Sequence, residues 1–248
     1  MKRILLATVG LVALATAPTL AADIPTKAPA YVPTYNWSGP YIGMSLGGRW
    51  ADANFTTVSI GGAPPPFAPT SRSVEIPAFR IGGYAGYNWQ LATSWLVGVE
   101  ADFAWGNGGV TKPGVVGGTP APVAGDSTKS EVFWDGSIRG RAGFLVTPTW
   151  LLYGTAGVAW QNIAATTTCS VATCFGLGGT QTDSRTLTGW TAGGGIEGMV
   201  SSNWLLRAEY RYSDYPTWRY TYFSGFAASV NDSKMRAHTA LLGLAYKF

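Results

Sequence analysis

The sequence predicts an all-β fold: an eight-stranded antiparallel transmembrane β-barrel with up-and-down topology. Segments of alternating apolar and polar residues recur along the chain, and aromatic residues stand near the ends of the apolar faces. Charged residues make up only 12% of the 248 residues, against about 25% in a typical soluble domain. These charged residues are too few for the surface of a soluble protein of this size. We therefore expect the apolar faces to contact lipid.

The N-terminal residues predict export. Lys2 and Arg3 precede an apolar run over 4–17, and small residues follow at plausible cleavage positions, which is typical of a secretory signal peptide. The run is too short for a permanent membrane helix. The predicted organisation is a signal peptide over 1–22, a Pro-rich periplasmic linker over 23–36 and the barrel domain over 37–248.

A repeated design divides the barrel domain into strands. Three segments each contain an alternating run, a short polar break, a Trp and a second alternating run: YAGYNWQLATSWLVGVEADFAW, GRAGFLVTPTWLLYGTAGVAW and GGGIEGMVSSNWLLRAEYRYSDY. The predicted strands cover about 40–50, 77–90, 95–105, 132–146, 150–162, 188–200, 204–214 and 237–248. The breaks at 91–94, 147–149 and 201–203 predict three short periplasmic turns.

The segments between these hairpins have another character. They are rich in Gly, Pro, Thr and Ser, without a sustained pattern, and cover 51–75, 106–131, 163–187 and 215–236. Short turns that alternate with long loops are typical of an outer-membrane barrel, whose long loops are extracellular. We therefore expect four long extracellular loops, with both termini in the periplasm.

The predicted lipid-facing surface is bracketed by aromatic residues. The step from Trp95 to Trp105 spans about 33 Å of strand, or about 25 Å of membrane at a tilt of about 40°. Rings at both ends suit the two water–lipid interfaces. The predicted aromatic girdle consists of Trp89, Trp95, Trp105, Trp150, Trp160, Trp190, Trp204, Tyr246 and Phe248.

The opposite face of the strands predicts a charged lumen. Its members are Arg49, Arg80, Glu100, Asp102, Arg139, Arg141, Glu197, Arg207, Glu209, Arg211 and Lys247. An eight-stranded barrel is only wide enough for its side chains, so we expect these charges to pair. Two hypotheses remain open: a polar plug that closes the barrel, favoured here, and a narrow path for small solutes between the charges.

The chain ends with LLGLAYKF. Gly243, Tyr246 and Phe248 resemble the C-terminal signal read by the outer-membrane barrel assembly machinery, although Leu241 stands where that signal prefers a polar residue. We expect this machinery and the outer-membrane lipid bilayer to be partners of the chain.

Several of these segments together resemble the outer-membrane immunogenic proteins of α-proteobacteria, within the porin family of small barrels. The resemblance rests on the Pro-rich segment and on YNWSGPYIGMSLGGRW, GGYAGYNWQ, IRGRAGFLV, WLLYGTAGVAW and GLAYKF. It implies an eight-stranded barrel of the bacterial outer membrane, exposed at the cell surface, with roles in envelope integrity and host contact. Some members are described as haem-binding or porin-like.

The remaining candidate sites are few. Cys169 and Cys174 predict a small disulfide-closed loop in an oxidising compartment. His238 is the only histidine, and haem ligation by it is an alternative to a simple interfacial role. The aromatic segment 210–223 is a candidate contact surface for host or surface ligands.

Three functional classes find no support in the sequence. One histidine and two thiols do not complete a metal site, and no nucleophile, base and acid form a recognisable triad. A net charge of +4 gives nucleic acid no basic surface. We therefore expect no cofactor, no metal, no catalysis and no nucleic-acid partner.

Overall fold

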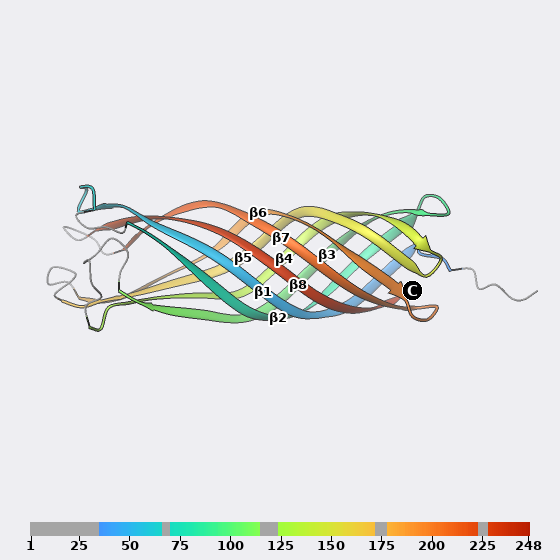
Figure 1. Ribbon diagram of the computed structural model, residues 1–248, viewed down its shortest axis with the longest axis horizontal. Coiled ribbons are helices and arrows are strands. Elements are labelled where there is room, and N and C mark those ends of the chain that lie inside the picture. The colour runs from blue at the N-terminus through green and yellow to red at the C-terminus, as the bar shows by residue number, and fades with distance from the viewer. Residues whose placement is uncertain (1–34, 66–69, 115–123, 172–177, 223–227) are drawn as a thin grey trace, which may run out of the picture. The chain divides into compact units, whose positions relative to one another are not determined.

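The computed structural model describes residues 35–65, 70–114, 124–171, 178–222 and 228–248. Eight antiparallel strands follow one another around a closed barrel, in which β1 also pairs with β8 (Figure 1). The strands are β1 (Gly39–Ile60), β2 (Ser71–Gln90), β3 (Trp95–Pro113), β4 (Ser127–Thr147), β5 (Trp150–Cys169), β6 (Gly179–Met199), β7 (Trp204–Tyr222) and β8 (Ser229–Lys247). Within the described residues, no helix is long and apolar enough to cross a membrane.

The three predicted turns are confirmed. Only 91–94, 148–149 and 200–203 separate the paired strands at the end of the barrel that carries the C terminus (Figure 1). The predicted signal peptide (1–22) and most of the predicted linker (23–36) lie outside the described residues, and their bounds stay predictions.

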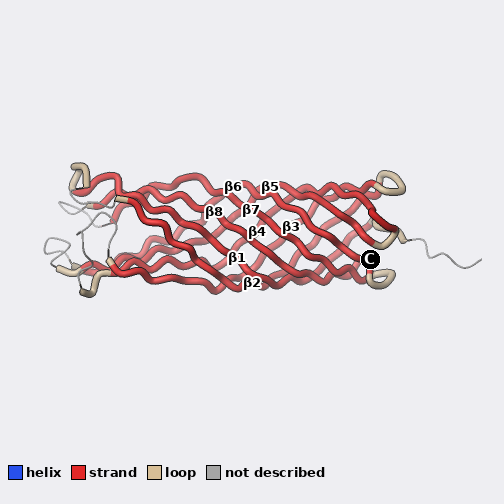
Figure 2. Tube along the Cα trace, viewed as in Figure 1, coloured by secondary structure: helices blue, strands red, loops and turns tan. Residues whose placement is uncertain are grey.

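The strands are much longer than predicted on the opposite side. β1 runs ten residues beyond its predicted end at Trp50, and strand covers most of the trace there (Figure 2). The 22 residues of β1 span about 70 Å at about 3.3 Å per residue, or about 55 Å of height at a tilt of about 40°. Since the apolar band of such a barrel is about 25 Å tall, the extra length projects beyond the membrane.

Outward aromatic residues mark where the character of the barrel changes. Trp50, Trp105 and Trp190 are exposed on the outer side, and Trp95 and Trp150 on the turn side. We call the part between these levels the membrane zone. The outer zone is the remainder, made of 51–60, 71–78, 106–113, 127–133, 161–169, 179–189, 215–222 and 229–237.

In the outer zone the ring of strands is interrupted twice. β2 and β3 pair only up to Phe79 and Asn107, and β6 and β7 only up to Trp190 and Asp214. The neighbouring pairs continue to the strand ends. The outer zone is therefore two four-stranded sheets, β7-β8-β1-β2 and β3-β4-β5-β6, whose ends lie at the left of Figure 1.

The two sheets face each other across an apolar core. Phe55, Ile76, Ile163 and Met235 are almost fully buried there. Four aromatic residues of β7 complete it: Tyr215, Trp218, Tyr220 and Tyr222. At the two seams, side chains reach across: Arg72 Nη1 donates to the Pro113 carbonyl at 2.9 Å and Gln181 Nε2 to the Thr221 carbonyl at 3.5 Å.

Candidate functional site: the charged lumen

Strand alternation directs the charged residues of the membrane zone into the lumen. Odd-numbered positions of β4 and β7 and even-numbered positions of β3 face inward, so each strand delivers charges two residues apart. The predicted members Glu100, Asp102, Arg139 and Arg207 are all buried. Their outward neighbours are apolar, as contact with lipid requires.

The network begins near the turn side with Arg141 and Glu197. Arg141 Nη2 lies 3.3 Å from Glu197 Oε1, and Arg207 Nε donates to Glu197 Oε2 at 2.8 Å. Arg207 Nη1 then donates to Glu100 Oε2 at 2.6 Å. The guanidinium of Arg207 thus bridges two carboxylates that come from opposite walls of the barrel.

The ion pairs continue through the middle of the lumen. Arg139 Nη2 donates to Glu100 Oε1 at 2.5 Å and its Nη1 to Glu209 Oε1 at 2.9 Å. Arg211 Nε lies 3.2 Å from Glu209 Oε1, and Arg211 Nη1 donates to Asp102 Oδ1 at 2.9 Å. Each of the charges in this middle layer therefore contacts at least two of opposite sign, which offsets the cost of desolvation.

The network ends near the outer zone on a residue that the sequence analysis missed. Asp135 accepts from Arg49 Nη1 at 2.5 Å and from Arg80 Nε at 2.9 Å, while Arg80 also pairs with Asp102. Asp135 shares the inward face of β4 with Arg139, so the alternation itself could have revealed it. With Asp135 included, the network holds six arginines and five carboxylates, so it is nearly neutral.

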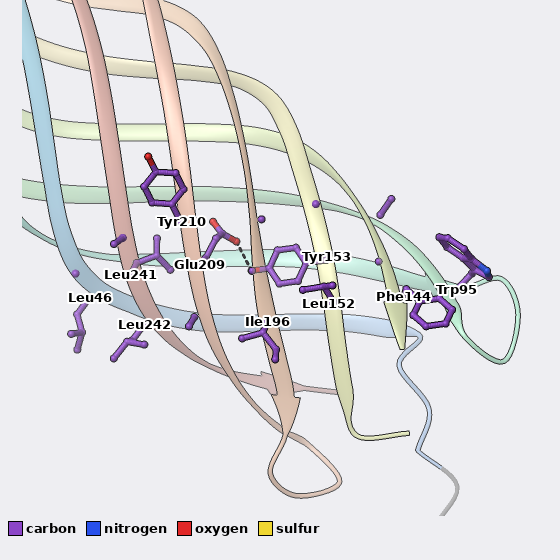
Figure 3. Close-up of a pocket in the computed structure, with 18 residues that line it drawn as sticks. Leu46, Trp95, Phe144, Leu152, Tyr153, Ile196, Glu209, Tyr210, Leu241 and Leu242 are labelled. Atoms are coloured by element: carbon purple, nitrogen blue, oxygen red, sulfur yellow. Dashed lines mark hydrogen bonds between the residues drawn. The ribbon is translucent and has the colours of Figure 1, made fainter. Parts of the chain in front are cut away.

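Three inward tyrosines outside the predicted set also belong to the network. Tyr41 Oη donates to Glu100 Oε2 at 2.8 Å, and Tyr153 Oη donates to Glu209 Oε2 at 2.5 Å (Figure 3). The Arg207 guanidinium carbon lies 4.1 Å from the ring centre of Tyr84. These rings fill space beside the arginines and satisfy carboxylate oxygens, so the lumen is packed as well as neutralised.

Inward glycines make room for these large side chains. A Cβ on Gly193 would lie 2.8 Å from Arg211 Cγ, and one on Gly243 would lie 2.8 Å from Tyr84 Oη and 2.9 Å from Arg207 Cγ. Such contacts are too close for carbon. Gly243 of the predicted assembly signal therefore has a packing reason of its own in the folded barrel.

An apolar layer closes the turn side of the lumen. Trp37 is fully buried, its Nε1 donates to the Pro148 carbonyl at 3.0 Å, and its backbone N–H donates to Gln90 Oε1 at 3.2 Å. Leu96 and Leu205 pack in the same cluster. The described lumen thus has three layers: apolar, charged and apolar.

The predicted girdle residues all face outward. Trp160 is half-buried and the others are exposed: Trp89, Trp95, Trp105, Trp150, Trp190, Trp204, Tyr246 and Phe248. Further outward aromatics outside the predicted girdle lie on the same band, among them Trp50, Phe79 and Phe144. Lys247 stands apart from the charged network, with Nζ 3.3 Å from the Phe248 carbonyl oxygen.

The remaining candidates are the single histidine, the aromatic segment 210–223 and the two cysteines. His238 faces outward, its Nδ1 2.6 Å from Tyr210 Oη. The aromatic segment 210–223 does not form an exposed contact surface in its described part, because Tyr215, Trp218 and Tyr220 are buried between the two sheets. Cys169 is disulfide-bonded, and Cys174 lies outside the described residues.

Comparison with known proteins assigns the fold to a family. Residues 7–248 match the family described as "Outer membrane protein beta-barrel domain". The chain belongs to this outer-membrane β-barrel family. It is 32% identical, over the whole of both chains, to the 31 kDa outer-membrane immunogenic protein of Brucella melitensis. The resemblance noted from the sequence is thereby confirmed, and so is the bacterial outer membrane as its location.

Two further comparisons agree. The 22 kDa outer membrane protein of Rhizobium leguminosarum is 32% identical over 68% of this chain and 67% of its own length. Among solved structures, the outer membrane protein OprG of Pseudomonas aeruginosa superposes with a TM-score of 0.51 at 12% identity, over 87% of this chain and 98% of that one. At that identity the likeness concerns the fold alone.

Proposed function

We propose that the chain is a closed structural barrel that anchors a two-sheet extracellular extension in the outer membrane. The observation that carries this proposal is the continuous filling of the lumen by Trp37 and its neighbours, the ion-pair network and the outer apolar core. The charged side chains form ion pairs with one another and do not line an open path for solutes. A lumen of this kind stabilises the envelope without conducting through it.

Planar-bilayer conductance of the refolded mature chain tests the proposal. We expect no discrete steps from protein whose barrel is shown to be folded by β-type circular dichroism and by heat-modifiable electrophoretic mobility. A Trp37→Gly variant, which loosens only the layer on the turn side, is expected to remain silent because the charged layer still closes the lumen.

Reproducible steps from the folded wild type would contradict the closed barrel and favour the narrow porin-like channel. Charge reversal at Arg139 should then change ion selectivity, because Arg139 lies at the centre of the charged layer. Steps that appear only with Trp37→Gly would show that the apolar layer, and not the charges, is the seal.

The second part of the proposal is surface contact through the outer zone. Support comes from its height beyond the membrane and from the relatives, which are named immunogenic outer-membrane proteins. Host or surface ligands then meet the outer faces and ends of the two sheets. A Ser73→Cys variant should react with a membrane-impermeant maleimide on intact cells, whereas Ser201→Cys, in a turn at the opposite end, should not. Equal labelling would contradict the orientation.

Two further parts of the sequence-based prediction stay proposals. Recognition by the barrel assembly machinery would use the closing strand β8, on which Tyr246 and Phe248 face outward and Gly243 faces inward. Deletion of Phe248 should lower the amount of folded barrel in the membrane, while Phe248→Tyr should not. The chain is also proposed to have no enzymatic activity of its own.

A further inference from the structure

The outward face of β8 changes abruptly from apolar to basic. Leu244, Leu242 and Ala240 lie on the lipid-facing side of the membrane zone, and the next outward position is His238. Arg236 and Lys234 follow two and four residues further out. Because alternate residues of a strand share a face, the three basic side chains form a ladder that starts where the lipid-facing residues end.

Aromatic side chains place the foot of this ladder at the water–lipid boundary. His238 pairs across the strands with Trp50 on β1 and Tyr212 on β7. The ring centroids of Tyr212 and His238 are 5.2 Å apart, and Tyr210 Oη lies 2.6 Å from His238 Nδ1. Tyrosine and tryptophan concentrate at the level of lipid headgroups, so Arg236 and Lys234 lie at or just beyond that level.

One carboxylate pairs with both cations and leaves Arg236 largely exposed. Asp214 Oδ2 lies 3.3 Å from Arg236 Nε, and Asp214 Oδ1 accepts from Lys234 Nζ. The Arg236 side chain stays 53% exposed, and neither of its Nη atoms contacts a partner among the described residues. Asp52, across the strands from Arg236, makes no ion pair with it in the described part of the chain. The guanidinium therefore presents its two Nη groups to the solvent, in the geometry that binds phosphate.

An apolar groove on the lipid-facing surface begins directly below and continues toward Trp95 on the turn side. It has a volume of about 1000 Å³, and its floor near β7 and β8 is made of small residues, with Gly194, Ala208 and Ala240 among them. Leu242 and Tyr210 border it (Figure 3). Tyr210 therefore contacts the groove with its ring and the ladder with its hydroxyl.

We propose that this surface holds one phosphate-bearing lipid of the outer leaflet, with its phosphate on Arg236 and Lys234 and an acyl chain over the groove. The two features are independent of each other: one is charge complementarity at headgroup height and the other is a hollow in the apolar face directly below it. The proposal does not depend on whether the lumen conducts.

The test is lipid retention by the refolded mature chain. The protein is reconstituted in nanodiscs of phosphatidylcholine, or of phosphatidylcholine mixed with phosphatidylglycerol. It is then released, and the lipids that stay bound are counted by native mass spectrometry. We expect phosphatidylglycerol to be retained in preference. The double variant K234Q/R236Q should weaken this retention by roughly fivefold for each cation removed. Ala240→Trp, which fills the groove and leaves the ladder intact, should weaken it as well.

Lys129→Gln is the matched control. Lys129 is an exposed cation of the outer zone that pairs with Glu131 at 2.8 Å, and its removal should leave retention unchanged. Equal retention of both lipids by the wild type, or equal retention by K234Q/R236Q and K129Q, would overturn the proposal. Displacement of the lipid by millimolar inorganic phosphate would also overturn it, since a free anion would then be sufficient to occupy the ladder.

Discussion

The membrane zone and the outer zone of this barrel are filled in opposite ways. In the membrane zone the outward side chains are apolar and the lumen holds paired charges such as Arg207 and Glu100, whereas in the outer zone the lumen holds Phe55, Trp218 and Met235. The surroundings explain the inversion. Lipid accepts only apolar side chains, which leaves the lumen as the place for polar groups, while water outside the membrane favours burial of apolar ones.

The backbone shows the same contrast. The ring of hydrogen bonds is closed throughout the membrane zone and opens at Phe79 and Trp190, where the outer zone begins. In lipid an unpaired backbone group costs several kcal/mol, whereas water can solvate a free strand edge. The closed ring is therefore a requirement of the bilayer, and the two seams occur where that requirement ends.

The largest expected effect tests the charged lumen. Glu100→Gln keeps the shape of the side chain but leaves Arg139 and Arg207 short of a carboxylate, so we expect the free energy of unfolding to fall by about 3–5 kcal/mol. Urea titration in lipid vesicles, followed by tryptophan fluorescence, measures it. Glu131→Gln removes a partly exposed ion pair of the outer zone and should cost less than about 1 kcal/mol. Equal losses of unfolding free energy in the two variants would show that the buried network stabilises the barrel no more than an exposed ion pair does.

The next effect tests the outer core. Trp218→Ala removes a buried ring that meets Phe55 edge to face with centroids 6.5 Å apart, and we expect a loss of about 3 kcal/mol. The loss should be local: hydrogen exchange should quicken in the outer zone and stay slow in the membrane zone. Its neighbour Arg219 faces outward, so Arg219→Ala should leave both zones protected. Loss of protection in both zones would mean that they unfold as one unit.

A smaller effect tests the seams. Backbone amides of β6 at 179–189 that point away from β5 have no strand partner, so they should exchange faster than those that point toward it. Amide exchange followed by NMR in detergent micelles resolves the two sets. Uniform protection along this segment would show that the seam is closed in solution.

The smallest effect concerns one surface pair of the outer zone. Arg219 donates to Asp232 through Nε at 2.7 Å and Nη2 at 2.8 Å, and these hydrogen bonds hold the pKa of Asp232 below its usual value. The pair stabilises the fold above the usual aspartate pKa and loses this contribution as the pH falls through the lowered value. Arg219→Gln should raise the pKa of Asp232 toward normal in an NMR titration, and an unchanged pKa would show that the pair is not formed.

Much of the membrane zone could be predicted from the sequence. The alternation from Trp95 to Trp105 and from Trp150 to Trp160 gives the lipid face, the lumen face and the positions of Arg139 and Glu100, because a strand spanning a membrane must alternate without interruption. The turns could be predicted for the same reason. Which arginine meets which carboxylate could not, since pairing depends on side chains from strands far apart in the chain.

The strands of the outer zone could not be predicted because the alternation of inward and outward residues changes phase within them. At Phe133–Trp134 and around Pro216 the register shifts, and the inward positions change from odd to even numbers. A period-two pattern that reverses its phase looks irregular in sequence, although Val132 and Trp218 are buried just beyond the shifts, on the outer side. In β1 the inward residues Ala51 and Ala53 are small, and they gave the pattern too little contrast.

The sequence by itself thus determined the barrel, its membrane band and the charged character of its lumen, because lipid imposes one rule on every residue that it touches. Only the tertiary structure decided how the charges neutralise one another, where Asp135 completes the network, and that the ring divides into two sheets. These features depend on contacts between distant strands, and in water no single periodicity records them.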